Sequence, residues 1–206
     1  MAGLFHEHVQ EIPYAGKERI ELYGLRIRMK IIAIADTHIK SGSITGALPA
    51  GLVEALKHAD LVIHAGDFIT KKAFDELSSI CNLEAVHGNM DEEALKRLLP
   101  GKKVIKLRNI KIGIIHEAAL SIQDTTGAGY MAREMGVDVL IFGHIHRPLI
   151  EKDEVLLACP GSPTAPRLSE PSALELVLED DSISGKVITF EGTRCEALES
   201  AREFGK

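Results

Sequence analysis

The sequence has few cysteines, few aromatic residues and no excess of positive charge. Its 206 residues include three cysteines and no tryptophan, and 24 lysines and arginines stand against 30 aspartates and glutamates, a formal net charge of −6. Cys81, Cys159 and Cys195 lie far apart and form no Cys-x-x-Cys pair. This spacing argues against a disulfide framework or a thiolate zinc site, and it favours a reducing compartment.

These absences also restrict the partners of the protein. A negative net charge gives no electrostatic footprint for tight binding to nucleic acid, and 4% aromatic residues offer no obvious stacking platform for bases. No apolar run approaches the roughly 18 residues that a membrane span needs. The N-terminal segment lacks the apolar centre of a signal peptide. We therefore expect a cytoplasmic protein that does not bind membranes and for which nucleic acid is a disfavoured partner.

The length predicts one domain with short extensions. Residues 1–28 are polar and lack a clear period, so we interpret them as an N-terminal extension that packs outside the domain or contacts a second subunit in a homo-oligomer. Residues 29–191 form the expected domain, and residues 192–206 form a C-terminal tail. His6 and His8 are spaced like metal ligands, but their polar context argues against that role.

Apolar runs and helical spacing predict the order of the elements. Expected strands cover residues 31–35, 60–65, 83–86, 104–107, 110–115, 137–142, 156–159, 174–178 and 186–190. Expected helices cover residues 48–59, 71–80, 94–99 and 130–135, and residues 40–46 form a loop. Thr70 is the expected cap of the second helix and Asp91 of the third. The pattern indicates an α/β (α+β) chain with two sheets packed face to face and helices outside.

Five of these strands end in side chains that can bind a metal ion. They are Asp36 and His38, Asp67, Asn89, His116, and His144 and His146. Each piece alone is weak, because Gly-Asp and Gly-Asn are common turns and a single histidine after a strand is more often structural. As a set they should converge, since sites in open sheets lie at the carboxyl ends of the strands.

The donor types restrict the metal. Two carboxylates, one amide oxygen and four imidazoles without a thiolate suit Mn²⁺, Fe, Ni²⁺, Zn²⁺ or Mg²⁺. Seven ligands are too many for one ion that keeps an open position. With one bridging carboxylate they suit two ions roughly 3.5–4 Å apart.

The ordered set Asp-x-His, Gly-Asp, Gly-Asn, His and Gly-His-x-His resembles the calcineurin-like metallophosphoesterase superfamily. The resemblance covers about residues 29–191. The stretches 60–67, 87–91 and 160–163 look like the small prokaryotic phosphodiesterase subfamily, which is also similar to a retromer subunit. The resemblance implies a four-layer αββα sandwich of two mixed sheets.

The resemblance also implies roles for individual residues. One ion would be held by Asp36, His38, Asp67 and His146, and the other by Asp67, Asn89, His116 and His144. Asp67 would bridge the two divalent ions, for which Mn²⁺ is our first expectation. A hydroxide held between the ions would attack a small-molecule phosphoester, most readily a phosphodiester. Asn89 and His116 would act as catalytic residues that touch the phosphate.

The chain departs from the family pattern at three positions. Met90 stands where larger relatives carry a proton-donating histidine, so leaving groups that need no proton are favoured. Glu117 replaces a usual glycine and adds a charge near the site, and His87 replaces a common arginine or lysine. For Asp91 we favour helix capping over a catalytic role.

Two alternatives to a phosphodiesterase that acts on small molecules remain open. One is a protein-binding scaffold of the same fold, as in the retromer relative, which is altered at one ligand histidine; the other is a nuclease. All seven ligand positions are competent here, and this favours the enzyme. Of the remaining candidates, His64 either orients a neighbouring ligand or, as we prefer, is a satisfied core histidine, and Arg167 is either an anion contact or a surface residue.

Overall fold

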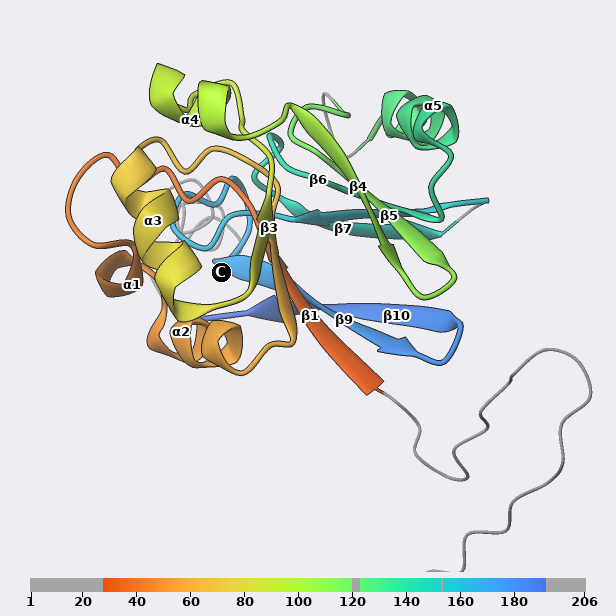
Figure 1. Ribbon diagram of the computed structural model, residues 1–206, viewed down its shortest axis with the longest axis horizontal. Helices are drawn as coiled ribbons and strands as arrows, with labels where there is room; N and C mark the ends of the chain where they lie inside the picture. The colour runs from red at the N-terminus through yellow and green to blue at the C-terminus, as the bar shows by residue number, and fades with distance from the viewer. Residues whose placement is uncertain (1–27, 120–122, 153, 192–206) are drawn as a thin grey trace, which may run out of the picture.

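The computed structural model describes residues 28–119, 123–152 and 154–191 (Figure 1). One five-stranded sheet has the order β10-β9-β1-β2-β3, and the other has the order β4-β5-β6-β8-β7. The strands of the first sheet are β1 (Arg28–Ile34), β2 (Leu61–His64), β3 (Leu83–Ala85), β9 (Ser172–Glu179) and β10 (Ser182–Thr189). Those of the second are β4 (Lys102–Leu107), β5 (Ile110–Ile115), β6 (Val139–Phe142), β7 (Pro148–Lys152) and β8 (Leu156–Pro160).

The central strands are parallel and buried. β1 pairs in parallel with β2, and β2 with β3, while β5, β6 and β8 form the parallel centre of the second sheet. All four residues of β2 and of β6 are buried, which explains their continuous apolar sequences. The outer strands β4, β7, β9 and β10 run antiparallel to their neighbours. Both sheets are therefore mixed, as the sequence predicts.

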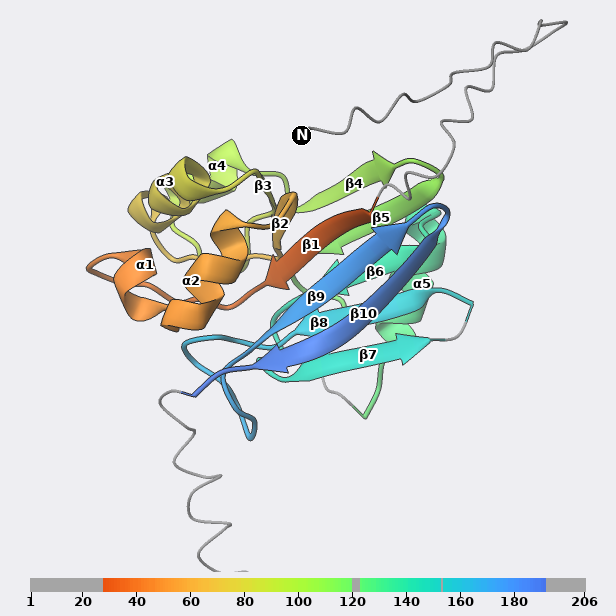
Figure 2. The same ribbon diagram turned by 90° about the horizontal axis from the view of Figure 1, so that it is seen from below.

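Three apolar clusters define four layers, and in Figure 2 the strands β1, β9 and β10 of the first sheet lie in front of the second sheet. The central cluster joins Ile31 and Ile63 of the first sheet to Ile114 and Ile141 of the second. Helices α1 (Ile44–Ala47), α2 (Ala50–Lys57), α3 (Lys71–Ile80) and α4 (Glu93–Leu98) lie on the first sheet, and α5 (Thr126–Met135) lies on the second. The predicted αββα sandwich is confirmed.

The structure differs from the sequence prediction in several elements. Residues 44–47 form a short helix inside the predicted loop, and α5 begins four residues before the predicted start at Tyr130. The prediction misses β7, an edge strand with half-exposed side chains and therefore no continuous apolar run. The terminal strands of the first sheet also begin earlier than predicted, at Ser172 and Ser182.

The predicted capping role of Asp91 is wrong. The N-cap of α4 is Glu92, and its side chain makes no capping hydrogen bond. Asp91 is buried, with 3% of its surface exposed, and accepts hydrogen bonds from the loops after β2 and β3. The capping motif and this contact use the same residue type, so local sequence alone does not separate them.

Several predictions fall outside the described residues. They concern the extension before Arg28, the pair His6 and His8, the tail 192–206 and Cys195. Among the described residues, no helix is both long and apolar enough to cross a membrane. Cys81 and Cys159 are free thiols.

Candidate metal centre

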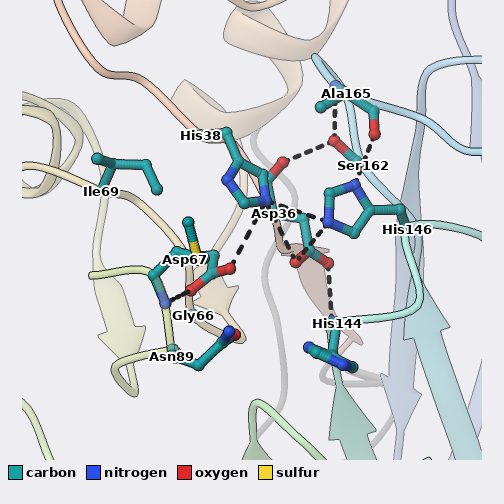
Figure 3. Close-up of polar contacts among 12 residues, drawn as sticks. Asp36, His38, Gly66, Asp67, Ile69, Asn89, His144, His146, Ser162 and Ala165 are labelled. Carbon is teal, nitrogen blue, oxygen red and sulfur yellow. Dashed lines mark hydrogen bonds and ion pairs between the residues drawn. The ribbon is translucent and has the colours of Figure 1, made fainter. Parts of the chain in front are cut away.

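The seven predicted ligands follow the carboxyl ends of five strands. Asp36 and His38 follow β1, Asp67 follows β2 and Asn89 follows β3 in one sheet, whereas His116 follows β5 and His144 and His146 follow β6 in the other. Because these strands run parallel within each sheet, their ends meet at one edge of the sandwich. Figure 3 shows the side chains gathered there, with the Asp36 carboxylate beside the rings of His38 and His146.

Asp36, His38 and His146 form the first potential ligand group. The Nε2 atoms of His38 and His146 are 3.1 Å apart, and Asp36 Oδ1 lies 3.4 Å from His146 Nε2 and 3.8 Å from His38 Nε2. Ligand atoms about 2.1 Å from one ion lie roughly 3.0–3.4 Å from each other at octahedral or tetrahedral angles. The separations are close to those expected around one ion.

A second group forms around His116. Its Nε2 atom lies 3.0 Å from Asn89 Oδ1, 3.4 Å from Asp67 Oδ2 and 4.0 Å from Asp36 Oδ1. The same Asp67 oxygen lies 3.6 Å from His38 Nε2. Asp67 Oδ2 therefore faces both groups, which is the placement a bridging carboxylate needs.

His144 converges less than the other six residues. Its backbone N–H donates to Asp36 Oδ2 at 3.0 Å, while its ring packs edge-on against His116 at a centroid distance of 5.5 Å. The ring nitrogen Nδ1 lies 3.8 Å from Glu117 Oε1. His116, Glu117 and His144 thus form a third group of potential ligands, and Glu117 is the member that the predicted ligand set did not include.

The polar groups at this edge fit a cation. Asp36 is fully buried, and within the described residues its Oδ1 atom has no hydrogen-bond partner. A buried carboxylate oxygen without a partner is costly unless a cation or donor meets it. His116 Nδ1 lies 2.8 Å from the carbonyl of Ala65, and His146 Nδ1 lies 2.6 Å from that of Ala165.

These two carbonyl contacts decide the imidazole tautomers. A carbonyl oxygen only accepts, so Nδ1 of each ring carries a hydrogen, and Nε2 is the nitrogen that faces the centre and could bind an ion there. The same support of a ring by a backbone carbonyl is usual for metal-binding histidines. The rings of His116 and His146 are therefore oriented as those of metal ligands are.

Burial and neighbouring charges alter the pKa values of the centre. Burial lowers the pKa of His146, against the attraction of Asp36. Burial also acts to lower the pKa of His116, but its contacts with Asp67 and Asp36 outweigh this and raise the value. For Asp67, burial acts to raise the pKa, and the contacts with His116 and the Met90 N–H lower it overall. The Asp67 carboxylate therefore stays charged and attracts positive charge.

The backbone at this edge is strained. Five of the seven predicted ligands have positive φ: Asp36 (54°), His38 (47°), Asp67 (62°), His144 (74°) and His146 (55°). Residues other than glycine adopt this region at a cost on the order of 1–3 kcal/mol each. Such strain persists where the surrounding structure enforces it, and here it turns side chains from two sheets toward one point.

Three buried residues support the predicted ligands: Ser162 and Asp91 were not predicted to do so, and for His64 this was the less favoured of two interpretations. Ser162 Oγ donates to the Asp36 carbonyl at 2.6 Å and accepts from Ala165 N at 2.8 Å. Asp91 Oδ2 accepts a hydrogen bond from the backbone N–H of Asp67 at 3.2 Å. His64 is fully buried; its Nε2 atom lies 3.1 Å from Thr37 Oγ1, and its Nδ1 atom accepts from Gly66 N at 3.2 Å. It therefore supports the loops that follow β1 and β2 from the core. The Pro-Gly-Ser-Pro stretch was the only sequence signal for Ser162.

Other candidates lie at the periphery. Half-buried His87 has Nδ1 3.3 Å from the Gly88 carbonyl. Exposed Arg167 donates its backbone N–H to the His146 carbonyl at 3.1 Å, and its charge contributes to lowering the pKa of His146. Their proposed contacts with an anion stay predictions.

The sequence matches a known family over most of the described region. The profile of the calcineurin-like phosphoesterase superfamily domain matches residues 29–181. A probable metallophosphoesterase of Methanothermobacter thermautotrophicus is 33% identical over 175 residues, which cover 84% of this chain and 100% of the relative. Another, from Methanocaldococcus jannaschii, is 38% identical over 165 residues, which cover 79% of this chain and 82% of the relative.

A solved structure shares the architecture. It is wild-type Vps29 of Entamoeba histolytica in complex with Zn²⁺, with a TM-score of 0.60 and 26% sequence identity. The alignment covers 79% of this chain and 100% of Vps29. The αββα arrangement is therefore shared with a protein whose crystal structure contains a divalent metal.

Proposed function

This chain belongs to the calcineurin-like phosphoesterase superfamily, and from that premise we propose that it is a metal-dependent hydrolase of phosphoesters, with phosphodiesters as its preferred class. The observation that carries the proposal is the buried Asp36 oxygen without a partner, surrounded by imidazole nitrogens at 3.4–4.0 Å. The catalytic domain in this proposal spans residues 29–191.

We assign one ion to Asp36, His38, Asp67 and His146, and the other to Asp67, Asn89, His116 and His144. Mn²⁺ is the first candidate, with Ni²⁺, Fe, Zn²⁺ and Mg²⁺ as alternatives. The shared orientation of Asp67 Oδ2 toward His38 and His116 supports the bridging assignment. When bound, two such ions lower the pKa of a shared water and neutralise phosphate oxygens.

The chain itself supplies orientation and polar contacts. The carbonyls of Ala65 and Ala165 hold the His116 and His146 rings with Nε2 toward the centre. Asn89, 3.0 Å from His116, offers its amide group to a phosphate oxygen at the same edge. We assign the catalytic contacts with substrate to Asn89 and His116.

Two residues favour phosphodiesters. Met90 is 55% exposed beside Asn89 and cannot protonate a leaving group. The Glu117 carboxylate, 3.8 Å from His144, adds negative charge where a phosphate would enter. A monoester carries more negative charge than a diester, so this charge disfavours the monoester.

The test is hydrolysis of bis-p-nitrophenyl phosphate and p-nitrophenyl phosphate with Mn²⁺ or with EDTA. We expect turnover of the diester to exceed that of the monoester and to require metal. Asp67→Asn and His116→Ala should lose more than the roughly 10–100-fold that changes in ligand-supporting residues cost. Asp60→Asn, which alters a carboxylate contact with Lys30 N far from the ligands, is the matched control.

A protein-binding scaffold is the second candidate, supported by the fold that the chain shares with Vps29. Purified protein without metal-dependent turnover of either ester would favour the scaffold. Single- and double-stranded DNA left intact after prolonged incubation with Mn²⁺ would reject the nuclease alternative. A cytoplasmic location and a homo-oligomer stay predictions.

A further inference from the structure

We propose that Asp91 is a positioning residue that sets the distance between the two loops carrying Asp67 and Asn89. These loops, residues 66–69 after β2 and residues 88–91 after β3, are called here the Asp67 loop and the Asn89 loop. The proposal rests on the metal centre proposed above, because it concerns how two of that centre's ligands are held.

The Asp91 carboxylate accepts backbone N–H groups from both loops. Its Oδ2 atom accepts from Gly88 N at 2.8 Å and from Asp67 N at 3.2 Å, and its Oδ1 atom accepts from Ile69 N at 2.6 Å. Asp91 Oδ2 therefore holds the backbone of Asp67 itself and the backbone of Gly88, the residue before Asn89. Hydrogen bonds to a charged acceptor are about twice as strong as neutral ones.

The two loops also hold each other in the opposite direction. Met90 N donates to Asp67 Oδ1 at 2.8 Å, and Glu92 N donates to the Ile69 carbonyl at 3.0 Å. Because Met90 occupies Oδ1, the other oxygen of Asp67 is the one that faces His38 and His116. The orientation of the bridging carboxylate therefore depends on the position of the Asn89 loop.

The two loops approach each other so closely that no side chain beyond glycine fits at their contact. A Cβ atom on Gly88 would lie 2.1 Å from Asp67 Oδ1, and one on Gly66 would lie 2.8 Å from Gly88 N and 2.8 Å from His116 Nδ1. Glycine at both positions permits this approach. The hydrogen bonds to Asp91 then hold the backbones at that distance.

A direct catalytic role for Asp91 fits the geometry less well. Both of its oxygens already accept backbone N–H groups, and the residue is buried. It has neither a free oxygen for an ion nor access to a leaving group. Its effect on the reaction is therefore transmitted through Asp67 and Asn89.

The experiment compares the full chain with the isosteric variant Asp91→Asn. An asparagine amide nitrogen cannot accept, so at least one of the three N–H contacts is lost. We expect the second of two Mn²⁺ ions to bind about 10–100-fold more weakly, measured by calorimetric titration with Mn²⁺ alone. We also expect loss of the electron paramagnetic resonance signal of a coupled Mn²⁺ pair.

Two further variants keep the result interpretable. Asp60→Asn is the matched control, because Asp60 Oδ2 accepts Lys30 N at 2.6 Å at the other end of the parallel strands; its Mn²⁺ binding should equal that of the wild type. If Asp91→Asn does not fold, Asp91→Glu decides, because it keeps both acceptor oxygens but lengthens the side chain. Weakened binding of the second ion in Asp91→Glu supports positioning.

The outcomes separate this proposal from the proposed function. Wild-type affinity for both ions in a folded Asp91 variant overturns the positioning role and leaves the function intact. A wild type that binds two Mn²⁺ ions, loses one on Asp91→Asn and hydrolyses neither ester supports positioning and rejects the enzyme. A wild type that binds no Mn²⁺ overturns both.

Discussion

In each of the two buried carboxylates at the centre, one oxygen accepts a backbone hydrogen bond and the other faces the candidate metal site. Asp36 uses Oδ2 to accept His144 N, and Asp67 uses Oδ1 to accept Met90 N. The remaining oxygens, Asp36 Oδ1 and Asp67 Oδ2, face the imidazole nitrogens. A backbone N–H thus orients each carboxylate and leaves one oxygen for a cation, which is why an amide at either position should be a poor substitute.

Glu117 offers a test of substrate charge at a single residue. Replacing it with glutamine removes a negative charge 3.8 Å from His144 without shortening the side chain. The charge is 57% exposed, so its interaction with a phosphate is about 1 kcal/mol or less. We expect Glu117→Gln to raise the monoester-to-diester ratio of kcat/KM by roughly two- to fivefold.

The ratio is measured with the two p-nitrophenyl esters at a saturating, fixed Mn²⁺ concentration. The control is Glu134→Gln on α5, which alters an exposed ion pair with Lys102 of β4 and should leave the ratio unchanged. A Glu117→Gln ratio equal to that of the wild type would show that this charge does not select among phosphoesters.

Among the elements, α1 depends on a contact from another helix. It has four residues and includes a glycine, so it is too short to form alone. The Glu76 carboxylate of α3 accepts the backbone N–H groups of Ile44 and Thr45 and the hydroxyls of Ser43 and Thr45. These contacts explain why a helix occurs where the Gly/Ser-rich sequence predicts a loop.

The same contacts predict a pH-dependent stability. Hydrogen bonds from Ser43 and Thr45 lower the pKa of Glu76 from 4.5 to about 2. A lowered folded-state pKa means that the contribution is complete above pH 4.5 and is lost as the pH falls toward 2. We expect Glu76→Gln to lower the free energy of unfolding by about 1–2 kcal/mol at pH 7.

Urea unfolding of both proteins between pH 7 and pH 3 measures this difference. The gap between wild type and Glu76→Gln should be constant down to about pH 5 and then shrink. Glu54→Gln, on the exposed face of α2, should not be distinguishable from the wild type at pH 7. A Glu76→Gln gap that grows on acidification would contradict the assigned direction of the pKa shift.

At the scale of the whole molecule, the candidate metal centre joins the two sheets. His116 Nδ1 of the second sheet donates to the Ala65 carbonyl of the first, and His144 N donates to Asp36. Bound cations would add links between the sheets and neutralise Asp36 and Asp67. We therefore expect Mn²⁺ at 100 times its Kd to raise the free energy of unfolding by about 2.7 kcal/mol for each ion bound.

Thermal unfolding with excess Mn²⁺ and with EDTA measures this stabilisation. Asp67→Asn should abolish most of the shift in Tm, because it removes a ligand of both ions, whereas Asp60→Asn should retain the shift. Equal Tm values for the wild type with Mn²⁺ and with EDTA would argue against a centre that binds metal when folded.

The sequence by itself determined the central strands, the sandwich and the order of the residues proposed as ligands. Strands buried on both faces need continuous apolar residues, so the end of each strand is visible in the sequence as the end of an apolar run. The polar residues that follow these runs are Asp36, Asp67, His116, His144 and His146. The seven ligand types and their order also identified the family. Edge strands such as β7 lack this signal because only part of their surface is buried.

Tertiary structure alone decided how the ligands are oriented and what supports them. Asp91 contacts Asp67 N across 24 positions and Glu76 contacts Ile44 N across 32, so no local pattern distinguishes these residues from helix caps or surface acids. The ring of His144 lies beside Glu117 rather than at the centre of the group. The burial of a strand can be predicted from the apolar character of consecutive residues. The partner of a polar side chain cannot, because it depends on which distant backbone groups the fold brings near.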